Sequence, residues 1–181
     1  MRALAILLVT VFVSSVASAE PVRTQAAGLR FTHPSDWVRV PAPSDMRAAQ
    51  FRIPKAGADP DDAEAVLFFF GEGKGGSAQD NLDRWYGQMT QPDGKPSKDA
   101  GTVTIKTING VKVTALDLPG TYKGMPTPGT PATSRSGYRL LAAIIEAKGG
   151  PWFFRIVGPD ATVKASKPAF DALLESAEAH Q

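Results

Sequence analysis

Two adjacent residues near the middle of the chain, Asn109 and Gly110, constrain its fold more than any other feature. They separate two runs rich in Thr, Val and other apolar residues, at 102–108 and 111–118. Asn and Gly both tolerate the positive φ angles that a two-residue hairpin turn requires. The sequence therefore predicts a β-hairpin here, and the sheet that contains it must be antiparallel at this point.

A second hairpin and several further strands follow from similar patterns. Glycines at 149–150 separate apolar runs at 138–147 and 152–157, which predicts the second hairpin. The almost purely apolar run at 64–70 is typical of a central strand buried on both faces. Weaker strand patterns lie at 29–32, 37–40 and 46–53.

Two helices are expected. Apolar residues recur with helical spacing over 77–89, and Ser77 can cap this helix together with the aspartate three residues further on. A closing helix is expected over 160–179. Pro168 should kink or restart it, with Ser166 as a local cap.

The order of these elements predicts the fold class. Residues 119–137 hold four glycines and four prolines, so we expect a long surface loop there, able to cover or expose a groove. Around it the order is strands, helix, hairpin, hairpin, helix. This order predicts a single α+β domain, with a mainly antiparallel sheet of about six to seven strands sandwiched by helices.

The amino-terminal segment reads as a secretory signal. Residues 1–19 combine an early arginine, an apolar core and a small-x-small cleavage pattern, so we expect export with cleavage before Glu20. The apolar core is shorter than the roughly 20 residues of a membrane span. We therefore expect no stable membrane insertion after cleavage. The mature protein would be soluble, in the periplasm or outside the cell, with an exposed lead-in at 20–28 and one domain at 29–181.

Composition narrows the function. The chain has no cysteine, which removes thiol nucleophiles and thiolate metal sites. The 20 basic and 18 acidic residues become 19 and 18 without Arg2, the only charged residue of the signal. Basic and acidic residues are thus nearly equal in number, and no basic run is present. We therefore expect no binding to nucleic acid.

A glycine-rich turn follows the predicted central strand. Gly71, Gly73 and Gly76 match the G-x-G-x-x-G pattern of dinucleotide-binding proteins. That fold requires a parallel strand after the helix, whereas a hairpin follows here. We therefore interpret the glycines as a tight structural turn that joins the buried strand to the helix, and we call this turn the glycine corner. A milder hypothesis is anion binding by free N–H groups of Gly75, Gly76 and Ser77 beside Lys74.

Three polar residues form a line beside the apolar face of the first helix: Asn81, Arg84 and Gln88. Two interpretations stay open for this line. The side chains either satisfy backbone groups of the preceding loop or present an edge that recognises a ligand.

No catalytic, cofactor or metal set is evident. His33 is expected to pack at a strand–turn junction, because a triad with Ser35 or Asp36 would need residues too close in sequence. The acidic residues at 59–64 do not match the spacing of a calcium-binding loop, so we interpret them as a solvated loop. We predict no cofactor and no metal.

Several fragments together resemble a group of exported bacterial proteins of unassigned function. The first is the strand–Pro–Trp opening at 29–37, and the others are the turn at 70–77, the helix start at 81–85 and the run at 152–159. The opening and the strand order are also similar to the PsbP-like fold. That fold is shared by the oxygen-evolving enhancer protein of photosystem II and by bacterial periplasmic proteins. The resemblance covers 29–178 and brings no catalytic residues with it.

The resemblance implies an α/β/α sandwich used as a non-catalytic accessory or binding domain. We therefore expect a protein partner or a small ligand. An enzyme of unknown reaction is the alternative. It would need a pocket that brings His33 or a carboxylate pair together with Arg84 or Lys74.

Overall fold

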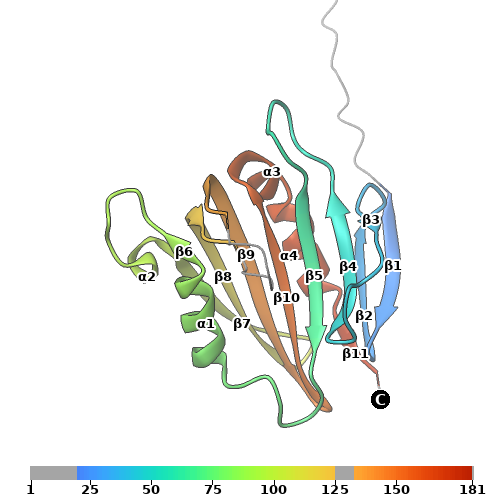
Figure 1. Ribbon diagram of the computed structural model, residues 1–181. Helices are drawn as coiled ribbons and strands as arrows, with labels where there is room; N and C mark the ends of the chain where they lie inside the picture. The colour runs from blue at the N-terminus through green and yellow to red at the C-terminus, as the bar shows by residue number, and fades with distance from the viewer. Residues whose placement is uncertain (1–19, 125–132, 181) are drawn as a thin grey trace, which may run out of the picture.

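A computed structural model describes residues 20–124 and 133–180 (Figure 1). The predicted signal at 1–19 and the middle of the expected loop, 125–132, lie outside the described residues. The elements follow one another in the order β1 Pro21–Ala26, β2 Leu29–Pro34, β3 Val38–Arg39, β4 Arg47–Ile53, β5 Ala63–Phe69, α1 Ala78–Gly87, β6 Met89–Thr90, α2 Ser97–Ala100, β7 Thr102–Ile108, β8 Val111–Tyr122, β9 Arg135–Ala147, β10 Gly150–Pro159, α3 Asp160–Ala165, α4 Lys167–Glu175 and β11 Glu178–Ala179.

The main sheet has eight strands in the order β3-β4-β5-β10-β9-β8-β6, with β7 also paired to β8. Every strand pairing of this sheet is antiparallel. The predicted α+β class with a mainly antiparallel sheet is therefore confirmed, with slightly more strands than expected. As predicted, β5 is central, between β4 and β10, and its middle residues Ala65, Val66 and Leu67 are fully buried.

Both predicted hairpins are present. Asn109 (φ 50°) and Gly110 (φ 78°) form the turn between β7 and β8. Both φ angles are positive, as a two-residue hairpin turn requires. The Asn109 side-chain amide also donates to the carbonyl oxygens of Glu175 (3.2 Å), the last residue of α4, and of Ala177 (3.5 Å), two residues further on. The end of the hairpin is thereby tied to the end of the last helix.

The strands of the second half are longer than expected, which corrects the prediction of a loop over 119–137. β8 continues to Tyr122, and β9 already begins at Arg135, opposite Tyr122. The rings of Tyr122 and Tyr138 stack with their centroids 6.3 Å apart. Cross-strand pairing thus continues past Pro119 and Gly120, which a sequence pattern interprets as turn residues.

Residues 20–28 are mostly exposed, as expected for a lead-in, but they also belong to the fold. Residues 21–26 form β1, which pairs with β2 along its whole length although most of its side chains are exposed. The turn between the two strands is Ala27 (φ 47°) and Gly28 (φ 76°). Alanine rarely adopts a positive φ, so no sequence pattern indicates a turn here. The indole Nε1 of Trp152 donates to the Ala27 carbonyl (2.9 Å) and supports this conformation.

The closing helix is interrupted and ends early. Pro168 lies in the first turn of α4, so the predicted restart is confirmed. Ser166 does not cap this helix, contrary to expectation, because its hydroxyl instead donates to the Thr162 carbonyl in α3 (2.9 Å). Glu178 and Ala179, predicted to be helical, form β11 on the free side of β2. A three-stranded sheet, β1-β2-β11, results.

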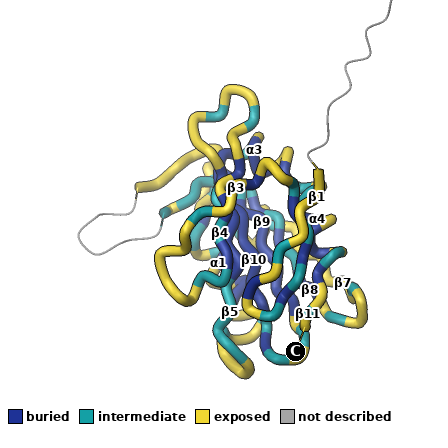
Figure 2. The backbone as a smooth tube through the Cα atoms, turned by 90° about the vertical axis from the view of Figure 1, so that its right-hand side faces the viewer, coloured by how far each residue is buried: buried dark blue, intermediate teal, exposed yellow. Residues whose placement is uncertain are grey.

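The main sheet separates two buried clusters (Figures 1 and 2). On one face α1 contributes Leu82 and Trp85, which pack with Leu118, Leu140 and Ile144 of β8 and β9. On the other face α3, α4 and the small sheet cover a larger aromatic cluster. Figure 2 shows that β9 and β10, which carry both clusters, are buried. None of the helices in the described residues is long and apolar enough to cross a membrane.

Candidate functional site

The predicted capping box at the start of α1 is confirmed. The Ser77 hydroxyl accepts from the Asp80 backbone N–H (3.1 Å), and the Asp80 carboxylate accepts from the Ser77 backbone N–H (2.9 Å) and hydroxyl (2.7 Å). Hydrogen bonds from the Ser77 side chain and backbone lower the pKa of Asp80. The chain's own carboxylate therefore occupies the place where an external anion would bind.

Other groups near this helix start leave little room for the anion hypothesis. The Lys74 backbone N–H donates to the Gly71 carbonyl (3.3 Å). The recess beside Gly76 and Ser77 is lined by the carboxylates of Glu72 and Glu146, with Lys148 as its one basic side chain. Binding by Lys74, Gly75, Gly76 and Ser77 stays a prediction, and one of the donors it needs, the Ser77 N–H, is already bound to Asp80.

The glycine corner is structural, as predicted. Gly71, Gly73, Gly75 and Gly76 all have positive φ. A Cβ atom at Gly75 would lie 2.6 Å from the Phe153 ring, so a side chain here would force that ring to move. The helix that follows leads to the β7–β8 hairpin and not to a parallel strand, which removes the dinucleotide interpretation.

The polar line of α1 divides into two roles. Asn81 is buried, and its amide donates to the carbonyls of Gly75 (2.9 Å) and Ser77 (2.8 Å), so it satisfies the loop backbone. Arg84 is exposed and donates to the Asn81 side-chain oxygen (2.9 Å). The Gln88 side-chain oxygen accepts from Arg155 of β10 (3.2 Å). The structure thus brings Arg84 and Gln88 to one place beside Arg155.

That place is a cavity of about 230 Å³ between α1 and the neighbouring strands, which we call the α1 cavity. Its walls are mainly aromatic, and its polar groups are two guanidinium groups and two side-chain amides. No carboxylate or histidine is among the lining residues. They are Met46, Phe68, Phe70, Asn81, Arg84, Trp85, Gln88, Phe153 and Arg155.

Buried contacts hold the inner guanidinium in place. The Arg155 side chain is 5% exposed, lies 3.8 Å from the Glu64 carboxylate and faces the Phe68 ring at 5.7 Å. Arg47 faces the same ring at 5.7 Å and donates to Glu64 (3.0 Å). One carboxylate therefore lies beside two arginines, and with Arg84 this part of the surface carries an excess of positive charge.

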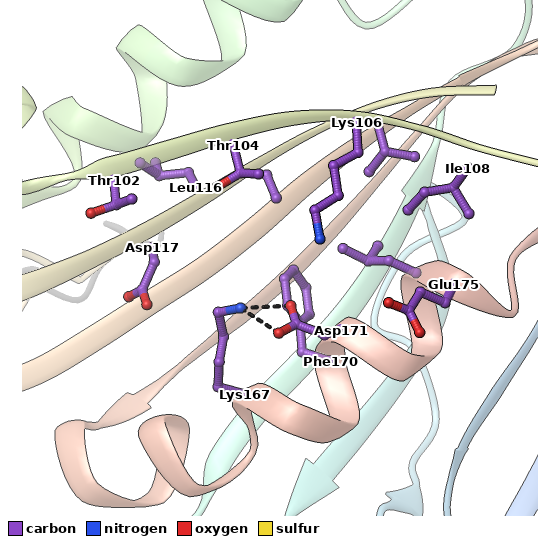
Figure 3. A pocket seen from close by; sticks show the side chains of 13 residues that line it. Thr102, Thr104, Lys106, Ile108, Leu116, Asp117, Lys167, Phe170, Asp171 and Glu175 are labelled. Carbon is purple, nitrogen blue, oxygen red and sulfur yellow. Dashed lines mark hydrogen bonds and ion pairs between the residues drawn. The ribbon is translucent and has the colours of Figure 1, made fainter.

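A second cavity, of about 220 Å³, lies on the opposite face of the sheet between α4 and the β7–β8 hairpin, and we call it the α4 cavity (Figure 3). Its floor is apolar and includes Phe170 and Leu174. Several charged groups at its mouth are already neutralised. Lys167 binds both oxygens of Asp171 (2.6 Å each), and Asp117 pairs with Arg139. The paired charges of the α4 cavity therefore favour a ligand of one charge sign less clearly than the side chains of the α1 cavity do.

His33 packs as predicted and takes part in neither cavity. Its ring is buried against Phe51, with centroids 4.6 Å apart. The Pro34 carbonyl can only accept, so Nδ1 carries the proton (2.8 Å) and Nε2 accepts from the Thr24 hydroxyl (2.9 Å). Burial lowers the pKa of His33, although the hydrogen bond to Pro34 raises it. His33 lines a separate hollow with Thr32 and Ser176, and the residues that line it include neither Arg84, nor Lys74, nor a carboxylate, so it is not the pocket that the enzyme alternative requires.

The acidic residues at 59–64 lie in a loop where Asp61 and Asp62 are exposed, as expected, and each acid binds a different partner. Asp59 accepts from the Thr162 backbone N–H (2.7 Å) at the start of α3, and Asp61 from Arg135 (3.0 Å). Asp62 accepts from Arg52 (2.9 Å) and from a backbone N–H, which lowers the pKa of this carboxyl. These acids connect elements and do not converge on one point.

Sequence reasoning missed most of the α1 cavity. It identified Arg84 and Gln88 but did not consider Arg155, Phe68 and Phe70 together with them. A signal did exist, because a single arginine interrupts the apolar run at 152–157. A charged residue in a buried strand needs partners, and such positions are often functional.

Comparisons with known proteins agree with this architecture. Neither a protein-family model nor a curated protein sequence matches the chain. The solution structure of cyanobacterial PsbP from Synechocystis sp. PCC 6803 is similar, with a TM-score of 0.54 and 15% identity, over 96% of this chain and 99% of that one. A Pseudomonas aeruginosa protein of unknown function aligns over 87% of this chain and 96% of its own, with 14% identity and a TM-score of 0.47. The strand order, the antiparallel pairing and the helical layers are thus those of the PsbP-like fold.

Proposed function

We propose that the chain is an exported, non-catalytic binding domain that takes up a small anionic amphiphile in the α1 cavity. The ligand class is an apolar body that carries one acid group. The observation that carries the proposal is the composition of the lining, which combines aromatic walls with two guanidinium groups and contains no carboxylate.

The size of the cavity limits the ligand. At roughly 30 Å³ per water-sized group, about 230 Å³ holds about eight non-hydrogen atoms. This volume favours a small molecule over a protein segment. The walls formed by Phe68, Phe70, Trp85 and Phe153 fit a ring or a short chain, because ligand sites are mostly apolar with a few placed polar groups.

Charge supports an acid group on the ligand. Arg84 is exposed at the cavity, whereas Arg155 is buried and oriented by Gln88 and Glu64. A guanidinium binds a carboxylate through two parallel hydrogen bonds, which neutral donors do not match in strength. The buried arginine and the exposed one together favour an anion over a neutral or cationic ligand.

Calorimetric titration with matched probes tests the proposal. We expect benzoate and hexanoate to bind, and their uncharged amides to bind about 10- to 100-fold more weakly, because a charge-assisted hydrogen bond contributes roughly 1.5–3 kcal/mol. Arg84→Gln should weaken benzoate binding. Arg23→Gln removes an equal charge from the exposed β1 strand and should not.

Two results would count against this function. Equal affinity for the acid and its amide would mean that the guanidinium groups do not read charge. Absence of binding by every probe up to millimolar concentration would remove the cavity as a ligand site.

Export belongs to the same proposal and rests on the pattern at 1–19. Expression with the full leader, followed by mass measurement of the exported protein, should give a chain that begins at Glu20. An uncleaved product that stays inside the cell would contradict it.

A further inference from the structure

Strand β7 is open on both faces and along one edge. Among the strands that the structure describes, it pairs only with β8, at the end of the main sheet. Among the described residues, 102–107 are all exposed, and Figure 2 draws this strand at an edge of the molecule. Val103 (39% exposed) and Ile105 (64% exposed) lie two residues apart, so they share the face that also carries α1.

The hairpin turn determines which backbone groups of β7 are free. A two-residue turn is closed by a hydrogen-bonded pair, here Ile108 and Val111. Bonded and non-bonded pairs then alternate along an antiparallel ladder. Thr104 therefore bonds to β8, whereas the N–H and C=O groups of Val103 and Ile105 point away from the sheet.

This edge has few of the features that prevent strand pairing. Its register with β8 is regular from Thr102 to Ile108, without a bulge, and it contains no proline. Lys106 is its only charged residue. A long, regular edge with exposed apolar side chains is a template for a further strand.

We propose that β7 is a dimerisation edge, and that a second copy of this chain pairs its own β7 with it in antiparallel register. Pairing centred on Thr104 places Ile105 opposite Val103 of the other copy, twice by symmetry. These are the residues whose backbone groups point outward, so the apolar match and the free hydrogen bonds coincide.

Charge also permits this register. Each Lys106 lies opposite Thr102, and the two lysines are four residues apart along the pair. At about 3.4 Å per residue this is about 14 Å, beyond the screening length of about 8–10 Å in physiological salt. No like charges therefore face each other directly across the pair.

The second copy would also extend the α4 cavity. Thr102, Thr104 and Lys106 line that cavity on the face towards α4 (Figure 3). In the proposed register, Lys106 of the second copy stands beside Thr102 at the open side of the cavity. The two α4 cavities then adjoin across the symmetry axis and share their walls.

Sedimentation analysis of the purified chain against concentration gives the first test. We expect a monomer–dimer equilibrium that Ile105→Pro weakens about tenfold or more, because proline removes an outward N–H group without affecting the bonds to β8. Ile105→Lys, which adds charge and leaves the backbone unchanged, should act in the same direction. Val22→Lys changes another exposed apolar side chain, on strand β1 of the small sheet, and this variant should dimerise normally.

Cross-linking tests the register separately, since the chain has no cysteine. Thr104 faces itself across the axis as a non-bonded pair, with Cα atoms about 4.5 Å apart, which a disulfide spans. Thr104→Cys should therefore form a disulfide-linked dimer under mild oxidation, whereas Thr102→Cys should not. A chain that stays monomeric up to millimolar concentration, or an Ile105→Lys variant that dimerises like the original, would overturn the proposal.

Discussion

At the scale of single residues, His33 shows how burial determines both packing and titration. The ring fills a gap between Phe51 and Trp37, and both of its nitrogens have hydrogen-bond partners. Burial, the largest cause, lowers the pKa of His33 below its ordinary value of 6.5. In the unfolded chain the same ring takes up a proton near that value.

The free energy of unfolding should therefore fall as the pH drops below about 6.5. In this window the unfolded chain binds more protons than the folded one, so acid favours unfolding, and the stability is fully present above the unfolded pKa. Urea titrations between pH 5 and 7.5 should show this loss in the unmodified chain and a flatter profile for His33→Gln. His180→Gln, at an exposed position, should keep the loss. An unchanged profile in His33→Gln would contradict the assignment.

At the scale of elements, how well the sequence predicted each piece depended on whether its signal was local. The Asn109-Gly110 turn, the Ser77 cap and the Pro168 restart are short-range features, and all three were predicted correctly. β1 was missed because its partner strand defines it and its turn begins with Ala27. The irregular alternation in β4 has a similar origin, since the register shifts between Arg47 and Ala49.

The candidate site was predicted only on its helical side. Arg84 and Gln88 share one helix, so their spacing reveals their proximity. Phe68 and Arg155 lie on β5 and β10, which are far apart in sequence and meet only through the order of strands in the sheet. No local pattern contains that order.

Two glycines of the glycine corner, Gly73 and Gly75, should respond differently to substitution. Gly75 and Gly73 both have positive φ, but a Cβ at Gly75 meets the Phe153 ring, whereas nothing lies within 4 Å of one at Gly73. Gly73→Ala should cost about 1–2 kcal/mol from backbone conformation alone. Gly75→Ala should cost roughly 1–3 kcal/mol more through overpacking. Chemical denaturation measures the loss of unfolding free energy in each variant. Equal losses would show that the Phe153 ring moves aside at no cost.

At the scale of the whole molecule, one sheet separates two cores that share no buried side chain. Ile53 belongs to the cluster under α3 and α4, and Ile144 to the cluster under α1. Their strands, β4 and β9, are three strand spacings apart, or about 14 Å. Packing changes in one core should therefore leave the other undisturbed.

A double-mutant cycle tests this independence. Ile53→Val and Ile144→Val should each cost about 0.5–1.5 kcal/mol. Together they should add to within about 0.5 kcal/mol. An interaction energy above about 1 kcal/mol, measured by urea unfolding, would mean that the sheet transmits strain between its faces.

The hydrogen bonds that tie the β7–β8 turn to the end of α4 depend on the side-chain amide of Asn109, which can hydrolyse slowly. The Asn109 amide is a donor that faces two carbonyl oxygens, those of Glu175 and Ala177. Hydrolysis of that amide during storage would leave a carboxylate, which can only accept and would repel both oxygens. A slow chemical change at one turn would then detach the β7–β8 hairpin from α4 and loosen the strand that we propose for dimerisation. Asn109, which forms the turn of the β7–β8 hairpin, would thus also limit how long the proposed dimer survives in storage.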